Sequence, residues 1–214
     1  HIREEKLGGK IATRLGNGLA PLEPGETDTV IIAGMGGDLI CKILKAKPEF
    51  LIEGKEFILQ PQSEWFKVRR LLKEYHYQIE KEWFLKEDGK YYVIIKAEPA
   101  WTQPQRLKHQ QPSIHEYIKE ISETPANQAV SEKDMESIYE QYGKYLIETK
   151  NPVLKEYLKK EITKKESIAA ELKQSIKEME SEELSGKERG NIAKRQRRYQ
   201  EIQKEIRDMR KAIG

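Results

Sequence analysis

A cluster of glycines after an apolar run is the part of this sequence best suited to binding chemistry. The run Thr29–Ala33 is rich in β-branched residues and predicts a strand buried on both faces. A glycine turn and a helical pattern over residues 38–45 follow it. Glycines let backbone amides approach a ligand, and a helix start offers unpaired N–H groups. We therefore predict a ligand crevice at the carboxyl end of this strand, lined by Ala33, Gly34, Met35, Gly36 and Gly37.

A second glycine turn precedes this one. Residues Lys10–Leu15 predict a strand, and Gly16, Asn17, Gly18 and Leu19 follow it. Asn17 is able to accept a hydrogen bond from an exocyclic amine, as a nucleotide-like cofactor would require. The alternative is an ordinary Asn-Gly turn. Because the two turns end consecutive predicted strands, we expect them to share one crevice.

A polar segment ends the third predicted strand, Glu56–Gln60. Gln60, Pro61 and Gln62 stand there, and the Gln60 amide is suited to a flat polar substrate such as a base edge. The alternative is a polar strand end before a helix that begins near a proline. That helix is predicted over residues 63–75, with Ser63 as its N-cap.

A hairpin completes the N-terminal half. Strands are predicted over Tyr77–Leu85 and Tyr91–Ala97, and the Asp88-Gly89 pair between them suits a tight primed turn. An antiparallel hairpin on an otherwise parallel sheet is characteristic of class I methyltransferases. We predict an α/β fold over residues 1–98: a Rossmann-like methyltransferase sheet that lacks its first strands. Because the sequence starts in the middle of a pattern, we expect an N-terminal part to precede it.

The rest of the chain has a different composition. Residues 99–130 hold four prolines and predict a linker or insertion with at most one short helix, over 114–121. Residues 131–214 predict a helical domain whose first helix is capped at Ser131. Two long amphipathic helices there predict an antiparallel coiled-coil hairpin. Its expected seam consists of Leu158, Ile162, Ala169, Leu172, Ile176, Met179, Tyr199, Ile202, Ile206, Met209 and Ile213.

The overall composition supports an extended element. Charged residues make up 35% of the 214 residues and the mean hydropathy is -0.81, too polar for one compact globule of this size. The single cysteine, Cys41, fits a reducing cytosol, so we expect a cytoplasmic protein. No apolar run is long enough to span a membrane, and the four histidines show no metal-ligand spacing. We therefore expect neither membrane nor metal.

The net charge of +3 does not by itself argue for nucleic acid, but the charge is unevenly distributed. A basic cluster is predicted at the tip of the helical hairpin, formed by Lys187, Arg189, Lys194, Arg195, Arg197 and Arg198. One interpretation is phosphate contact with RNA. The other is a solvated face paired with nearby glutamates. The sequence leaves both open.

Several motifs together closely resemble one family. In order they are GNGL (residues 16–19), PGE (24–26), DTVIIAGMGG (28–37), LQP (59–61) and EDGKYY (87–92). The set is similar to the TrmK-type bacterial tRNA (adenine(22)-N1)-methyltransferases. The resemblance implies a catalytic domain that uses S-adenosylmethionine and a C-terminal coiled coil that helps to hold tRNA.

The resemblance also implies roles for single residues. Residues 16–19 would line the adenosine side of the cofactor, and residues 33–37 would lie where the methyl group is transferred. Gln60, Pro61 and Gln62 would border the pocket of the target base. The charge of the basic cluster, and not the resemblance, makes Arg195, Arg197 and Arg198 the candidates for contact with tRNA. The family's glycine-rich cofactor loop and its candidate catalytic acid would lie upstream of His1. Asn17 stands where some members have Asp, and Gln62 where Asn is common.

Two other functions are compatible with these residues. One is a non-catalytic protein that binds RNA or a partner and keeps only the sheet and the coiled coil. The other is a class I methyltransferase with a different substrate.

Overall fold

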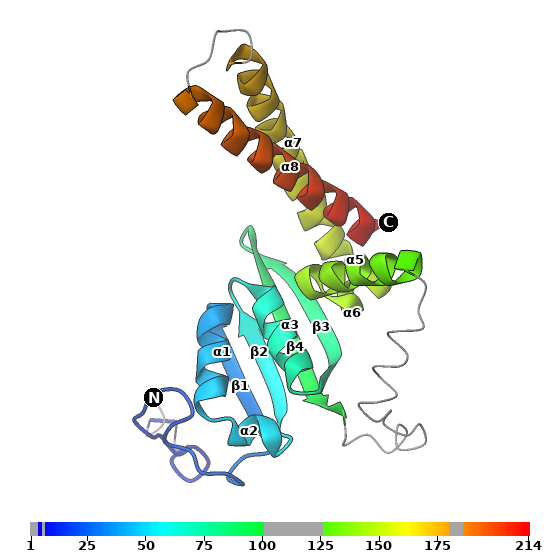
Figure 1. The fold of residues 1–214 in the computed structure, drawn as a ribbon. Coiled ribbons are helices and arrows are strands. Elements are labelled where there is room, and N and C mark those ends of the chain that lie inside the picture. The colour runs from blue at the N-terminus through cyan, green and yellow to red at the C-terminus, as the bar shows by residue number, and fades with distance from the viewer. Residues whose placement is uncertain (1–3, 6, 101–125, 180–185) are drawn as a thin grey trace. The chain divides into compact units, whose positions relative to one another are not determined.

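The structure, a computed structural model, describes residues 4–5, 7–100, 126–179 and 186–214 (Figure 1). The chain divides into two compact units. One comprises His1–Glu80 and Ile95–Lys108, and the other Lys81–Ile94 and His109–Gly214. The short helix predicted over residues 114–121 lies outside the described residues.

The described strands form one sheet in the order β1-β2-β4-β3. β1 (Thr29–Met35) pairs in parallel with β2 (Glu56–Pro61), and β2 pairs antiparallel with β4 (Lys90–Pro99). β3 (Tyr77–Glu87) lies at the edge beyond β4. The predicted mixture of parallel strands and an antiparallel hairpin is thus confirmed. Asp88 and Gly89 both have positive φ, as the predicted primed turn requires.

Helices α1 (Gly37–Ala46) and α3 (Trp65–Glu74) lie on the same face of this sheet (Figure 1), and the short α2 (Glu49–Ile52) follows α1. The core between sheet and helices is mainly apolar, with Ile40, Leu44, Phe57, Leu59, Leu72 and Ile95 all 0% exposed. One charged residue of α3, Arg69, is also buried, at 4% exposed. The prediction that β1 is buried on both faces is wrong. Val30 and Ile32 are buried, but Ile31 on the opposite face is 67% exposed because the helices of this unit cover only one face.

Two local predictions at element ends are also wrong. Residues 10–15 form no strand: they run as exposed irregular chain beside no strand partner in the described residues. Ser63 does not cap α3, because the residue at the N-cap is Glu64, with a φ of 52°, and no side chain bonds to the helix end. The Ser63 carbonyl instead accepts a hydrogen bond from the Gly37 N–H, at 2.9 Å.

The second unit contains α5 (Ala126–Tyr142), α6 (Lys144–Glu148), α7 (Pro152–Met179) and α8 (Gly186–Ile213). α5 begins five residues before Ser131, so Ser131 is inside the helix and does not cap it. Asn151 caps α7, because its Oδ1 accepts hydrogen bonds from the N–H groups of Val153 and Leu154, each at 3.0 Å.

The helices α7 and α8 pack side by side and run antiparallel (Figure 1). Their contacts show the direction: Lys165 pairs with Glu205, whereas Ser175, further along α7, accepts a hydrogen bond from Arg195, which comes earlier in α8. Six residues of the predicted seam are buried, namely Leu158, Ile162, Ala169, Ile202, Ile206 and Met209. The other five are only half-buried, namely Leu172, Ile176, Met179, Tyr199 and Ile213. The buried side chains of the pair are Leu154, Leu158, Ile162, Ala169, Ile192, Ile202, Ile206, Met209 and Ala212.

The distal part of the β3–β4 hairpin belongs to this second unit and contacts the start of α7. The Tyr91 ring lies 5.8 Å from that of Phe84 and 5.0 Å from that of Tyr157, between ring centroids. Over this aromatic cluster, the Glu156 carboxylate accepts from Lys86 at 2.7 Å and pairs with Lys160 at 2.9 Å. The hairpin tip and α7 are therefore held by one contiguous cluster, which we call the hairpin latch.

Candidate functional site

The carboxyl end of β1 donates a hydrogen bond to a side chain of β2. The Gly34 N–H donates to Gln60 Oε1 at 2.7 Å, and Gly34 has a φ of 77° with open space where a Cβ would stand. Because the N–H donor must face the oxygen of the amide, this bond fixes which way the Gln60 amide points. Gln60 Nε2 is then buried with no hydrogen-bond partner in the described part of the chain. Gln60 thus positions the glycine turn directly.

Gly37 is needed for close packing between loops. A Cβ on Gly37 would lie 2.6 Å from the Glu64 carbonyl oxygen and 2.7 Å from that of Ser63. The Gly37 N–H bonds to Ser63, and the Asp38 N–H donates to the Glu64 carboxylate at 3.2 Å. The prediction that the start of α1 offers unpaired N–H groups is therefore wrong for its first two residues.

An ionic network joins the start of α1 to the start of α3. Asp38 pairs with Lys42 at 2.8 Å and with Lys67 at 3.0 Å, and Lys67 also pairs with Glu64 at 2.6 Å. The hydrogen bonds from Lys42 and then Lys67 lower the pKa of Asp38 to about 2. A carboxylate with so low a pKa is a poor general base at neutral pH. The network therefore joins α1 to α3 and gives no candidate for proton abstraction.

Gln62 and Pro61 complete this edge. The Gln62 N–H donates to the Met35 carbonyl at 2.8 Å, its side chain is exposed, and Pro61 is buried. Ala33, Gly34 and Met35 are exposed beside them. The structure thus brings together two of the three predicted segments, residues 33–37 and 60–62, at the carboxyl ends of β1 and β2.

The third segment, residues 16–19, lies elsewhere. A Cβ on Gly18 would stand 2.8 Å from the Ile43 side chain, and one on Gly16 would meet Pro21 at 2.6 Å. Ile43 is six residues beyond Gly37, about 9 Å along α1. The expectation of one crevice shared by both turns stays a prediction. Since residues 10–15 form no strand, no described strand leads into this turn.

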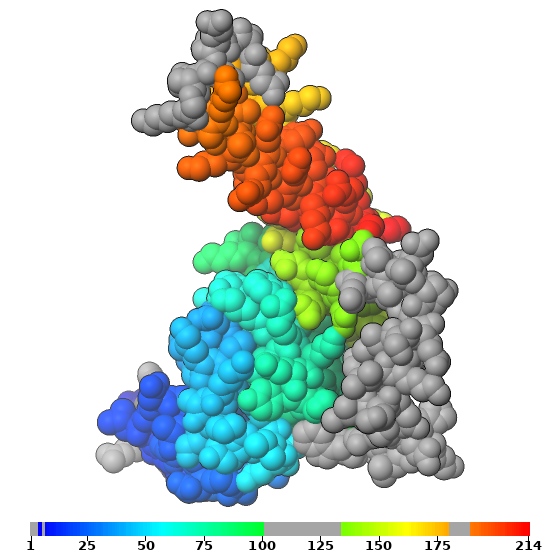
Figure 2. All heavy atoms as spheres, viewed as in Figure 1, coloured from blue at the N-terminus to red at the C-terminus, as the bar shows by residue number. Residues whose placement is uncertain are grey.

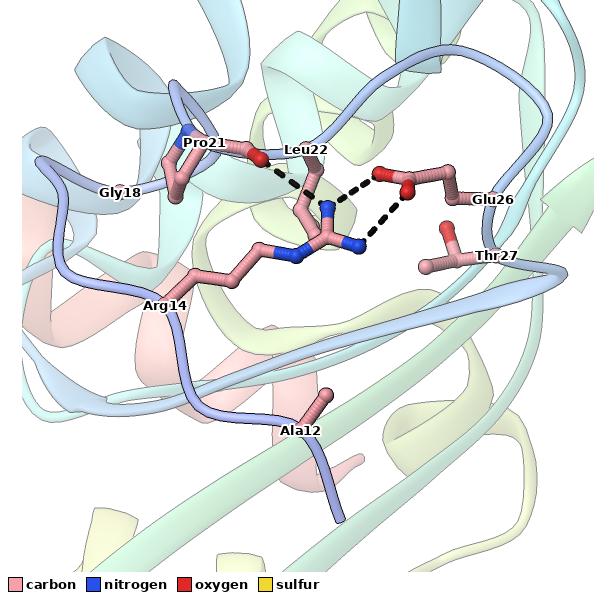
Figure 3. Close-up of a pocket in the computed structure, with 7 residues that line it drawn as sticks. All are labelled: Ala12, Arg14, Gly18, Pro21, Leu22, Glu26 and Thr27. Atoms are coloured by element: carbon pink, nitrogen blue, oxygen red, sulfur yellow. Dashed lines mark hydrogen bonds and ion pairs between the residues drawn. The ribbon is translucent and has the colours of Figure 1, made fainter. Parts of the chain in front are cut away.

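The turn instead borders a pocket of roughly 450 Å³ (Figure 3). Across it, Arg14 makes two bonds to the Glu26 carboxylate, at 2.5 and 2.7 Å, and a third to the Pro21 carbonyl. The Arg14 hydrogen bond lowers the pKa of Glu26 to about 2. The residues that line the pocket are Ala12, Arg14, Gly18, Pro21, Leu22, Glu26 and Thr27.

The sequence did not predict the Arg14–Glu26 pair. The only local sequence feature that points to it is the Pro24-Gly25 turn directly before Glu26. Because the two charges neutralise each other, the residues that line the pocket leave no unpaired charge for a ligand.

The predicted basic cluster is partly engaged within the chain. Arg195 donates to the Ser175 hydroxyl, and Arg198 pairs with Glu201 at 3.1 Å and with Glu205 at 3.4 Å. Arg197 is exposed and has no ion pair in the described part of the chain. The described residues also contain no group of three or more His, Cys, Asp or Glu arranged to hold a metal ion. None of the described helices is long and apolar enough to cross a membrane.

A parallel β1–β2 pair, a glycine turn at its carboxyl edge and an inserted antiparallel hairpin define a Rossmann-like methyltransferase fold. Solved structures share this fold. A Streptococcus agalactiae protein of the NADB-Rossmann superfamily superposes with a TM-score of 0.63 at 22% identity, over 100% of this chain and 72% of that one. The chain belongs to the family described as TrmK, tRNA (adenine(22)-N(1))-methyltransferase, whose model matches residues 1–128.

Individual relatives agree with this family. A Bacillus subtilis tRNA (adenine(22)-N(1))-methyltransferase is 38% identical over 97 residues, which are 45% of this chain and 41% of the relative. The crystal structure of the B. subtilis m1A22 tRNA methyltransferase TrmK matches 100% of this chain and 74% of its own, with 23% identity and a TM-score of 0.66. M. capricolum TrmK, solved with S-adenosyl-homocysteine, matches with 21% identity and a TM-score of 0.60, over 99% of this chain and 72% of that one.

The described residues do not by themselves make a complete site for S-adenosylmethionine. The cofactor would need the segments 16–19 and 33–37 around one ligand, and the pocket beside residues 16–19 is lined by none of residues 33–37. The amides at the start of α1 and the carboxylates of Asp38 and Glu64 are already bonded within the chain. The carboxyl ends of β1 and β2 therefore form only one side of such a site.

Proposed function

We propose that the protein takes part in the methylation of N1 of adenine 22 in tRNA, with S-adenosylmethionine as the methyl donor of the complete reaction. Membership of the TrmK family gives the reaction. The single structural observation that supports it is the hydrogen bond between Gly34 and Gln60, because it joins the two segments that the resemblance assigns to the reacting groups. The chain matches only 41% of the length of its curated B. subtilis relative, so the activity is proposed for it and not taken over from the relative.

The residues of this chain would act mainly by position. The nucleophile in such a reaction is a ring nitrogen of the substrate, so the protein has to orient the base and exclude water. The target base must leave its stack to be reached. We propose that residues 33–37 form the wall at the site of transfer and that Gln60, Pro61 and Gln62 border the base.

Two further assignments complete the proposal. Residues 16–19 are proposed for the adenosine side of the cofactor on the strength of the resemblance alone. The antiparallel pair α7–α8 is proposed to act as a coiled coil that contacts tRNA, with Arg195, Arg197 and Arg198 as its first candidates.

A genetic experiment tests the activity. The gene is deleted in its own host, and adenine 22 of the cellular tRNAs is examined by primer extension, which stops at N1-methyladenine. We expect the stop to disappear on deletion. A stop that persists, or a lost methylation at another position, would refute the proposal. Complementation with the 214-residue chain then shows whether this chain restores the stop.

The incomplete cofactor wall favours one second candidate, a non-catalytic tRNA-binding protein. This candidate predicts that the 214-residue chain still binds tRNA but fails to restore the stop. A chain that restores it would exclude this candidate.

A further inference from the structure

One arginine closes the irregular loop that leads from residues 16–19 toward β1, at the N-terminal end of the chain in Figure 2. Arg14 donates two hydrogen bonds to the Glu26 carboxylate, at 2.5 and 2.7 Å, and a third to the Pro21 carbonyl, at 3.1 Å (Figure 3). Arg14 and Glu26 stand twelve positions apart, and the chain between them forms neither helix nor strand. Closing such a loop costs conformational entropy, which these bonds offset. We call Arg14, Pro21 and Glu26 the loop clamp.

A tight turn directs the Glu26 carboxylate toward Arg14. The Glu26 N–H donates to the Glu23 carbonyl at 3.3 Å, and Gly25 between them has a φ of 84°, as a type II turn requires. The Glu26 carboxylate also accepts a hydrogen bond from the Glu23 N–H, at 2.7 Å. The Arg14 and Glu26 side chains are 43% and 33% exposed, and a simple ion pair of that exposure would contribute little. The bidentate arrangement instead fixes direction as well as distance.

Within the closed loop, two glycines hold the turn against fixed neighbours. A Cβ on Gly16 would meet the Pro21 ring at 2.6 Å. A Cβ on Gly18, whose φ is 57°, would meet the Ile43 side chain at 2.8 Å. Asn17, between these contacts, is exposed, and in the part of the chain that the structure describes its side-chain amide has no hydrogen-bond partner. The closed loop therefore presents a free amide on a backbone that is held on both sides.

We infer that Arg14 and Glu26 act as positioning residues for the cofactor, because the clamp holds the turn in the conformation that presents Asn17 to the adenosine group. This inference rests on the proposed function, which assigns residues 16–19 to that side of the cofactor. The clamp acts through the backbone: Arg14 fixes the Pro21 carbonyl, and the Pro21 ring in turn packs against the turn. An amide in that place suits adenine because its oxygen accepts and its nitrogen donates.

Amide hydrogen exchange of the ligand-free 214-residue chain tests whether the clamp holds the turn. The reporters are the N–H groups of Ala20 and Leu22, which donate hydrogen bonds within the loop. In Arg14→Lys both should exchange at least about tenfold faster, because lysine keeps the charge but lacks the planar fork that binds carboxylate and carbonyl together. Glu74→Gln, which removes an exposed ion pair between α1 and α3, is the control and should leave both rates unchanged. Unchanged rates in Arg14→Lys, or equal increases in the control, would overturn the inference.

Isothermal titration with S-adenosyl-homocysteine tests the consequence for the cofactor. We expect Kd to rise by about threefold or more in Arg14→Lys, since a smaller fraction of the chains holds the turn closed, and to stay unchanged in Glu74→Gln. A Kd that stays unchanged in Arg14→Lys while exchange is faster would disprove the positioning role. No binding by the unmodified chain would instead refute the cofactor assignment of residues 16–19 in the proposed function, and the inference with it.

Discussion

At the residue scale, Gly37 shows how a glycine that suggests a ligand can be required by packing. Its position at a strand end suggested close approach of a cofactor. The atoms nearest to its missing Cβ are instead the carbonyl oxygens of Ser63 and Glu64. Gly34, three residues earlier, has open space on that side and a φ that favours glycine. Of the glycines in this turn, Gly34 is thus the one free to face a ligand.

Replacement of Gly37 by Ala should destabilise the protein. The added methyl group would press on backbone that cannot move aside as a side chain would, and we expect a loss of about 1–3 kcal/mol in the free energy of unfolding in urea. The control is Gly190→Ala in α8, where a Cβ meets nothing within 4 Å. That change should stabilise its helix by about 0.5–1 kcal/mol. Equal stability of Gly37→Ala and the unmodified protein would contradict the packing role.

At the element scale, the hairpin latch links two elements that are distant in sequence. Glu156 of α7 accepts hydrogen bonds from Lys86 and Tyr91 of the hairpin. The bond from Lys86, followed by that from Lys160, lowers the pKa of Glu156 to about 2, compared with an ordinary value of 4.5. A carboxyl whose pKa is lower in the folded state stabilises that state above its unfolded pKa, and the contribution disappears as the pH falls through the folded value.

The latch should therefore weaken between about pH 4.5 and pH 2. We expect the urea midpoint of the unmodified protein to fall across this window more than that of Glu156→Gln, which has no proton to take up. Glu87→Gln, at an exposed neighbouring position of the hairpin, is the control and should follow the unmodified protein. If Glu156→Gln shows the same pH dependence, the latch carboxylate does not contribute.

Elements defined by strong local chemistry could be predicted from the sequence. The residue types at Asp88 and Gly89 favour the positive φ values that the turn adopts. The spacing of apolar residues in α7 and α8 determines which side chains are buried between them. Lys10–Leu15 was mispredicted because a strand needs a partner, and a β-rich stretch does not reveal whether one lies beside it. Ser63 was mispredicted as the cap of α3 because its carbonyl accepts a hydrogen bond from the start of α1. Such a tertiary contact cannot be predicted from the local sequence.

The same distinction applies to the candidate site. Residues 33–37 and 60–62 could be grouped from the sequence because parallel neighbouring strands end at one edge. The bonds from Arg14 to Glu26 and from Gly34 to the Gln60 side chain join residues at least twelve positions apart, and no short pattern encodes them. The engagement of Arg198 by Glu201 is local, at i and i+3, and could have been foreseen from spacing.

At the scale of the whole molecule, the exposed face of β1 affects behaviour in solution. Ile31 is 67% exposed in a strand at the edge of the sheet, where unpaired backbone groups invite another chain. We expect concentration-dependent self-association in sedimentation velocity, reduced by Ile31→Lys. Leu15→Lys is the matched control, because Leu15 is fully exposed but outside any strand. Equal reduction by both changes would assign the association to general surface hydrophobicity.

The order β1-β2-β4-β3 also has a consequence for how the chain folds during synthesis. β3 is made before β4, yet its neighbour in the sheet is β4 and not the earlier β2. β3 therefore has no place in the sheet until the ribosome has released the strand that follows it. A two-residue turn allows the hairpin to close locally within microseconds. We infer that β3 and β4 pair first and join β2 together, so the Asp88-Gly89 turn determines when the sheet can be completed.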